Sequence, residues 1–137
     1  MTVISFVASE KYRQEDAEIY NQMCQHLKRY GDVDTEHLKV PGVLVAEVTH
    51  PSTSVGYDIG KIIEGNNLNW ISTHDQKRIL CLYRSRDEEF LKRMSKLGNP
   101  ILVNSGLNLR EYSSIEEARI HIDDFFKNKR KQKLSLL

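Results

Sequence analysis

The sequence predicts one α/β domain in which a mostly parallel sheet carries helices on both faces. Three observations favour this class. Short β-branched apolar runs alternate with segments whose apolar residues recur at helical spacing. The run Val43–Ala46 is continuously apolar, which is typical of a strand covered on both faces. The chain has 137 residues, 39% hydrophobic and 28% charged, which suits a folded domain and argues against disorder.

The first part of the chain predicts a strand, a helix and a second strand. Val3–Ser9 is a short β-branched run that suits a buried strand. Gln14–Tyr30 has one apolar face and is followed directly by Gly31, a common helix stop. Asp32–Glu36 is a second, weaker strand. The apolar face of the helix consists of Tyr20, Met23, Cys24, Leu27 and Tyr30.

The rest of the chain continues the alternation. Strands are expected at Val43–Val48, Ile79–Tyr83 and Asn108–Tyr112, and helices at Ser54–Glu64 and Asp87–Leu97. A closing helix follows, because Ile115, Ala118, Ile122, Phe125 and Phe126 form an apolar stripe.

The residues on either side of this stripe predict where the closing helix begins and where the folded domain ends. Ser113 and Glu116 are spaced as a capping box in front of the closing helix. We therefore expect the folded domain to span residues 1–127 and residues 128–137 to form a basic, disordered tail.

One connection does not fit a regular parallel sheet. Only six residues, including Pro41 and Gly42, separate Glu36 from Val43, whereas a parallel crossover needs about a dozen or more. The second strand is therefore displaced, antiparallel or paired in some unusual way. The opposite irregularity follows, since Gly65–Gln76 is a long stretch before the next strand. We expect an altered connection between the second and third strands.

Composition excludes several classes of protein. A net charge of +1 argues against nucleic acid or acidic lipid as a partner. No apolar run approaches the length of a membrane span, and the N-terminus does not resemble a secretory signal. Cys24 and Cys81 suggest reduced thiols in an intracellular protein, with a cytoplasmic location. The basic run Lys127–Lys133 leaves a nuclear location or a solvated tail as alternatives.

Motifs for metals and cofactors are missing from the sequence. The five histidines show no paired ligand spacing, and neither cysteine belongs to a CxxC pair, so we expect no metal site. The sequence has no GxxxxGK phosphate loop and no GxGxxG fingerprint, and we expect no cofactor.

Two segments follow predicted strands at the edge of the sheet where such folds bind ligands, Ser9–Arg13 and Thr49–Asp58. The second contains three consecutive hydroxyls, residues 52–54, and then Gly56, at the start of a helix whose free N–H groups favour an anion such as phosphate. Asp58 follows about one turn into that helix. The alternative is an ordinary turn with a capping residue and an aspartate that complements the helix dipole.

A family resemblance starts from the same segment. VLVAEVTHPSTSVGYDIGK, followed by KRILCLYR, resembles the 2'-deoxynucleoside 5'-phosphate N-hydrolases, relatives of the nucleoside 2-deoxyribosyltransferases. SFVASEKYRQEDAEIYNQMCQHLKRYGDVDTEH matches the first strand, helix and second strand of that family, and EYSSIEEARIHIDDFF its closing segment. The resemblance covers about three quarters of the chain. It implies a Rossmann-like, flavodoxin-like three-layer sandwich with a mostly parallel five-stranded sheet, and a homodimer.

The resemblance also implies a reaction. In the family, a carboxylate at the VGYE position attacks C1' of deoxyribose and displaces the base, and water then releases 2-deoxyribose 5-phosphate. The nucleophile position is Asp58 in this chain. Lys11 takes the place of a family arginine. The positions that would bind substrate or its phosphate are Ser9, Lys11, Ser52, Ser54 and Gly56.

Three positions depart from the family pattern. Asp58 is one methylene shorter than the family glutamate, and Ser5 stands where the family has a tyrosine on the first strand. A family helix with an acidic residue before LNW is absent between the second and third strands. A similar string, residues 67–70, occurs later, and there Asn67 replaces the acid. We hypothesise that Gly65–Thr73 forms a helix that fills the place of the missing one.

The favoured interpretation is a hydrolase that cleaves the N-glycosidic bond of 2'-deoxynucleoside 5'-monophosphates through Asp58. The first alternative is a catalytically impaired relative that binds nucleoside monophosphates. A base-exchanging deoxyribosyltransferase is disfavoured, because the serine-rich loop suits a phosphate better than a free 5'-hydroxyl. A module that binds protein or nucleic acid through the basic tail is supported by composition alone.

Overall fold

A computed structural model describes residues 2–9, 13–50, 53–66, 77–84 and 107–127 of the chain. Within these residues, five strands form one parallel sheet in the order β2-β1-β3-β4-β5, which is the flavodoxin-like order. The predicted fold class is confirmed. The strands are β1 (Val3–Ala8), β2 (Asp32–Asp34), β3 (Val43–Glu47), β4 (Arg78–Tyr83) and β5 (Leu107–Glu111). The helices are α1 (Arg13–Leu27), α2 (Thr53–Asn66) and α4 (Ile115–Lys127).

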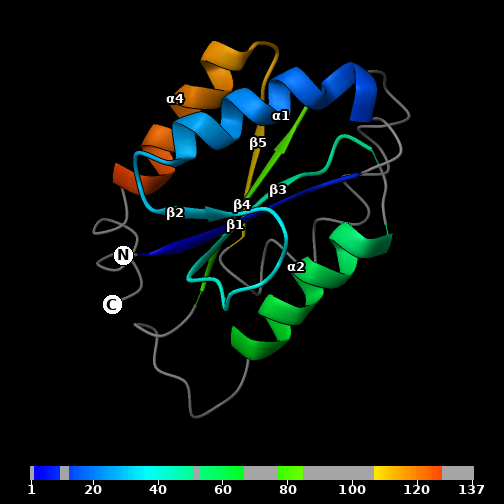
Figure 1. Cartoon of the computed structure of the whole chain (residues 1–137), viewed down its shortest axis with the longest axis vertical. Coiled ribbons are helices and arrows are strands. Elements are labelled where there is room, and N and C mark those ends of the chain that lie inside the picture. Colours follow the sequence, from blue (N-terminus) through cyan, green and yellow to red (C-terminus); the bar gives the residue numbers. More distant parts are fainter. Residues whose placement is uncertain (1, 10–12, 51–52, 67–76, 85–106, 128–137) are drawn as a thin grey trace.

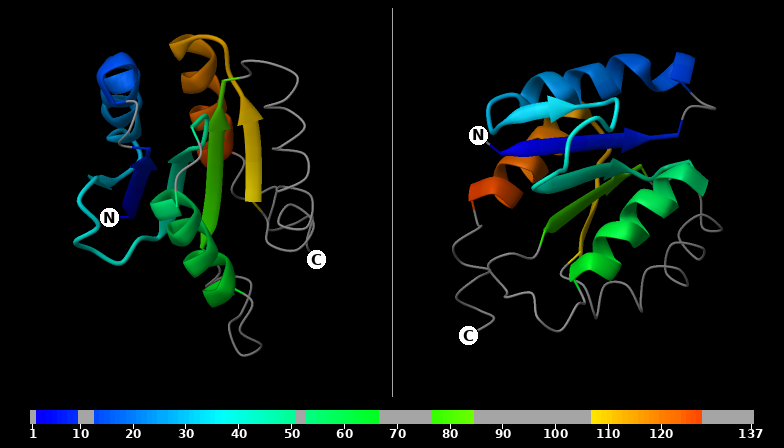
Figure 2. Two further views of the ribbon diagram at one scale, coloured as in Figure 1. Left: turned by 90° about the vertical axis from the view of Figure 1, so that its right-hand side faces the viewer. Right: turned by 60° about the horizontal axis from the view of Figure 1, so that its bottom comes forward.

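The sheet separates two apolar cores. Helices α1 and α4 cover one face and α2 covers the other (Figures 1 and 2). Successive strand residues point to opposite faces, so each buried strand contributes to both cores. The α1/α4 core contains Ile4, Phe6, Val43, Val45, Leu80 and Leu82 from the strands. The α2 core contains Val7, Leu44, Ala46, Ile79 and Cys81.

The end of α1 and the cap of α4 differ from the predicted ones. α1 ends at Leu27, because the next residues form a tighter turn in which the amide of Tyr30 donates to the carbonyl of Leu27 at 2.9 Å. α4 is capped by Ser114, whose Oγ accepts from the amide of Glu117 at 3.2 Å, while the Glu117 carboxylate accepts from the Ser113 amide at 3.1 Å. The predicted pairing of Ser113 with Glu116 is therefore wrong by one residue.

The short connection between β2 and β3 is explained by strand register. Asp34 at the end of β2 lies opposite Ser5, and Val43 at the start of β3 lies opposite Ile4 on the other side of β1. Residues 35–42 therefore step back by one residue, against the strand direction, and cross two strand spacings, about 10 Å. No crossover helix is needed. The altered connection is confirmed, and β2 pairs in parallel at the sheet edge.

Two predicted helices lie wholly or partly outside the described residues. The helix predicted at residues 87–97 lies outside the described residues. The segment predicted as a separate helix at Gly65–Thr73 begins inside α2, which runs to Asn66, and the remainder of it is not described. None of the helices within the described ranges is long and apolar enough to cross a membrane.

Two glycines provide a matched test of the fold. A Cβ added at Gly31 would overlap the carbonyl oxygen of Thr2, where β1 and β2 meet, whereas a Cβ added at Gly60 on α2 meets no atom within 4 Å. Gly31→Ala should therefore destabilise the protein by about 2 kcal/mol through overpacking. Gly60→Ala should stabilise it by roughly 0.5–1 kcal/mol because alanine favours a helix. Urea unfolding measures both, and equal effects would contradict the explanation.

Candidate active site

A cavity with a volume of about 470 Å³, here called the α2 cavity, lies beside α2. One wall is a face of α2 and the other is the β2–β3 connection, residues 37–41. Ser5 of β1 and Leu44 of β3 lie between these walls. A volume of this size is typical of small-molecule sites, for which about 300–1,000 Å³ is usual.

Helical spacing directs Asp58 into the α2 cavity. Val55 and Ile62 are buried against the sheet, and Asp58 lies between them on neighbouring turns. Asp58 is half-buried and lines the cavity together with Lys61, one turn further along. The predicted nucleophile position and Ser5, which stands at the family tyrosine position, therefore lie in the same cavity.

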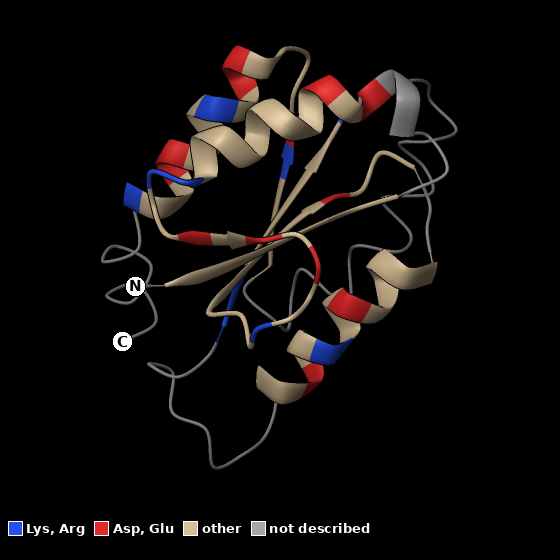
Figure 3. Cartoon of the chain, in the orientation of Figure 1, with Lys and Arg blue, Asp and Glu red and all other residues tan. Residues whose placement is uncertain are grey.

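Basic side chains outnumber acidic ones around the α2 cavity. Lys39, Lys61 and Lys77 line it, and Asp58 is the one carboxylate among its described lining residues. These lysines come from the β2–β3 connection, from α2 and from the residue before β4, and Figure 3 shows Lys and Arg of the described residues in blue. Lys39 also forms an exposed ion pair with Asp32. This excess of positive charge suits an anionic ligand.

The end of α2 and the start of β4 are clamped together at this cavity. The Asn66 amide nitrogen donates to the Lys77 carbonyl and the Lys77 amide donates to Asn66 Oδ1, each at 2.7 Å. Both residues line the α2 cavity. The stretch between them, residues 67–76, contains Asn67 and lies outside the described residues.

A second cavity of about 210 Å³, here called the β1-edge cavity, lies between β1 and α1. β2 pairs with β1 only as far as Ser5, so Phe6–Ala8 extend beyond β2 and line this cavity. Ser9 is buried and lines it too. His37 lines both cavities and is the one residue that their described linings share.

The structure describes some of the predicted site residues and not others. Asp58 lies in the α2 cavity and Ser9 in the neighbouring β1-edge cavity. Ser54 and Gly56 are exposed in the first turn of α2, and a Cβ at Gly56 would meet open space. The remaining predicted positions, Lys11, Ser52 and Asn67, lie outside the described residues.

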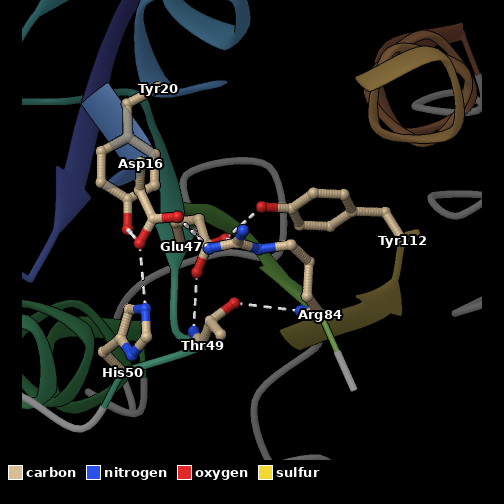
Figure 4. A network of polar contacts seen from close by, with 7 residues as sticks. All are labelled: Asp16, Tyr20, Glu47, Thr49, His50, Arg84 and Tyr112. Carbon is tan, nitrogen blue, oxygen red and sulfur yellow. Dashed lines mark hydrogen bonds and ion pairs between the residues drawn. The ribbon is translucent and has the colours of Figure 1, made fainter. Parts of the chain in front are cut away.

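Sequence reasoning missed a buried polar network at the carboxyl ends of the strands, shown in Figure 4. Asp16 of α1 accepts hydrogen bonds from Arg84 at 2.5 Å and from His50 at 2.9 Å. Glu47, the last residue of β3, accepts from the Thr49 amide at 2.6 Å. We call this set the strand-end network, and it comprises Asp16, Tyr20, Glu47, Thr49, His50, Arg84 and Tyr112.

The strand-end network shifts the pKa values of Asp16 and Tyr112. Burial opposes ionisation of Asp16, yet the hydrogen bonds and positive charge of Arg84 and His50 lower its pKa below the ordinary value. Burial and the nearby Glu47 raise the pKa of Tyr112, whose hydroxyl donates to that carboxylate. Arg84 lies between the carboxyl groups of Asp16 and Glu47, with its Nε 3.8 Å from Glu47.

This network holds the chain that leads into α2. Thr49 and His50 immediately precede residues 51–52 and the first turn of α2. The Thr49 side chain accepts from the Arg84 amide at 3.0 Å, and the His50 ring contacts Asp16. Both residues are buried. The start of α2, and through it Asp58, is thereby positioned against β3, β4 and α1.

Two other kinds of chemistry, metal binding and thiol reactivity, were considered among the described residues. Among the described residues, no group of three or more histidine, cysteine, aspartate or glutamate side chains could hold a metal ion. Burial raises the pKa of the Cys24 thiol to about 11 and that of the Cys81 thiol to about 12, which disfavours the reactive thiolate.

Comparison with known proteins identifies relatives across most of the chain. No protein-family model matches it. A Trichoplax adhaerens protein whose assigned name is that of a 2'-deoxynucleoside 5'-phosphate N-hydrolase is 30% identical, over 90% of this chain and 92% of its own length. The 5-hydroxymethyl-dUMP N-hydrolase of Danio rerio is 31% identical, over 66% and 75%. That of Homo sapiens is 30% identical, over 65% and 61%.

Proposed function

The chain belongs to the 2'-deoxynucleoside 5'-phosphate N-hydrolase family as a divergent member, and from this premise we propose that it hydrolyses the N-glycosidic bond of 2'-deoxynucleoside 5'-monophosphates. The observation that carries the proposal is the position of Asp58, a carboxylate in a nucleotide-sized cavity one to two turns from the start of α2. 5-Hydroxymethyl-dUMP, named for several relatives, is among the substrates to test.

A nucleotide lying along α2 would meet the required groups in order. The helix N-terminus and the hydroxyls near Ser54 favour the 5'-phosphate at one end. The sugar would then lie beside Asp58, and the base would enter the space between the far part of α2 and residues 37–41. Ser9 in the neighbouring cavity would help to hold the phosphate end.

The proposed reaction follows the logic of a retaining glycosidase. A carboxylate oxygen of Asp58 bonds to C1' as the C1'–N bond breaks and its electron pair leaves with the base. Water then attacks C1', breaks the ester to Asp58 and releases 2-deoxyribose 5-phosphate. Confinement between α2 and the β2–β3 connection brings the sugar and carboxylate together, which is a large part of the expected rate gain.

Product analysis tests this function. The purified protein is incubated separately with each 2'-deoxynucleoside 5'-monophosphate and with 5-hydroxymethyl-dUMP, and free base and 2-deoxyribose 5-phosphate are measured by chromatography. We expect both products in equal amounts, and slower release from the unphosphorylated nucleosides. A second free base in the mixture separates hydrolysis from transfer, because a deoxyribosyltransferase would form a new nucleotide.

A second candidate is a nucleotide-binding relative with impaired chemistry. The departures from the family at Ser5, Asp58 and Asn67 favour it, since a misplacement of about 1 Å at a reacting group can cost about 100-fold in rate. Monophosphate binding by calorimetry without any base release at high protein concentration would identify this case.

A further inference from the structure

The reaction proposed above also needs a proton for the departing base. When the C1'–N bond breaks, the electron pair remains on a base nitrogen, and protonation there makes the base a better leaving group. Asp58 must be ionised to act as the nucleophile, so it cannot supply this proton. Another side chain in the α2 cavity is required.

The described lining of the α2 cavity contains few proton donors. Besides Asp58, its ionisable side chains are one histidine and three lysines. Lysine ammonium groups ordinarily titrate far above neutral pH, whereas imidazole ordinarily exchanges its proton near neutrality. Lys39 is also engaged by Asp32. The chemistry of the lining therefore singles out His37.

We propose that His37 is the general acid that protonates the departing base, an inference that rests on the proposed function. As the Asp58 oxygen bonds to C1', the imidazolium gives its N–H proton to the base nitrogen that receives the C1'–N electron pair. In the second step, water adds to C1' and gives a proton to the neutral imidazole, which restores both residues. The net reaction consumes one water and releases one base.

Local structure holds the backbone at His37 in one conformation. Its φ is 59°, and it is the one residue other than glycine with positive φ among the described residues. The buried Asp34 carboxylate fixes the backbone on both sides of it, accepting from the Glu36 amide at 3.1 Å and the Lys39 amide at 2.9 Å. A left-handed conformation at a non-glycine residue is retained only where its surroundings impose it, and such residues cluster at functional sites.

The position of His37 between the cavities suits contact with a base. It lines the α2 cavity opposite Asp58 and Lys61, and it also lines the β1-edge cavity. A sugar beside Asp58 therefore places its base against the segment that carries the imidazole. His37 is exposed, so the exchanged proton can equilibrate with solvent.

The test compares two leaving groups in His37→Asn. Asparagine tolerates positive φ, so the backbone at this position is preserved while the acid is lost. With the best natural monophosphate, kcat should fall by about 100-fold or more, as expected for loss of a general acid. With 4-nitrophenyl 2-deoxyriboside 5-phosphate, whose phenolate leaves without protonation, kcat should stay within a few-fold of wild type.

The control variant is His121→Ala, which removes an imidazole of α4 that contacts the Glu111 carbonyl away from both cavities, and both rates should be retained. Equal losses of His37→Asn on both substrates, or no loss on the natural one, would overturn the role of His37 alone. If wild type releases neither base nor nitrophenolate, the proposed hydrolase function fails and this inference fails with it.

Discussion

Replacing Asp58 with alanine is expected to lower the rate of base release by about 10³-fold or more, because the nucleophile of the proposed reaction is removed. The fold should be retained, since residue 58 is half-buried within α2 and alanine is the residue most favourable to a helix. The measurement is the steady-state rate with the best monophosphate, together with the circular dichroism of both proteins.

Two further variants test whether the lost rate is specific to the carboxylate of Asp58. Glu64→Ala removes an exposed carboxylate from the same helix and should leave the rate unchanged. Asp58→Glu restores the longer side chain of the family and should raise the rate by roughly 10- to 100-fold, if Asp58 is held about 1 Å too far from C1'. A rate of Asp58→Ala within tenfold of wild type would remove Asp58 from the mechanism.

The same alanine variant distinguishes a hydrolase from a nucleotide-binding protein. In both cases, the negative charge near the sugar and phosphate is removed, so affinity for a monophosphate should be kept or increased. Only the hydrolase loses turnover at the same time. Calorimetric binding of a monophosphate to wild type and Asp58→Ala therefore shows whether a lost rate reflects lost chemistry or lost binding.

Local patterns were sufficient to predict most of the elements. The run from Val43 is apolar at successive positions because β3 is covered on both faces, and that burial is visible in the sequence. The cap of α4 was misplaced because Ser113 and Ser114 are adjacent and each is followed three residues later by a glutamate. Backbone geometry, which no spacing rule contains, selects Ser114.

Features that depend on distant residues could not be predicted in this way. The register that lets residues 35–42 cross β1 depends on which residues of β1 face β2 and β3. Asp16 and Arg84 are 68 residues apart, and only closure of the sheet brings them together. In the sequence, nothing distinguishes Asp16 from the other polar residues of its helix. The presence of His37 and Asp58 in the lining of one cavity has the same origin, since it requires the strand order of the sheet.

Replacing Asp16 with asparagine is expected to destabilise the protein by about 3 kcal/mol, because it leaves the Arg84 cation in a largely buried site without one of its two carboxylates. Asp16 is almost fully buried and also contacts His50 and Tyr20. Urea unfolding at neutral pH measures the loss. Asp124→Asn is the matched control, because its pair with Arg110 is exposed, and it should cost less than about 1 kcal/mol.

The pH dependence of this loss identifies its electrostatic origin. The pKa of Asp16 in the folded protein lies below its ordinary value, because Arg84 and His50 outweigh the effect of burial. Its carboxylate therefore stabilises the fold above about pH 4, and this contribution is lost as the pH falls through the lowered pKa. Asparagine cannot lose a charge, so the difference between wild type and Asp16→Asn should narrow from pH 7 to pH 3. A constant difference would mean that Asp16 stabilises the start of α2 through packing and neutral hydrogen bonds, without its charge.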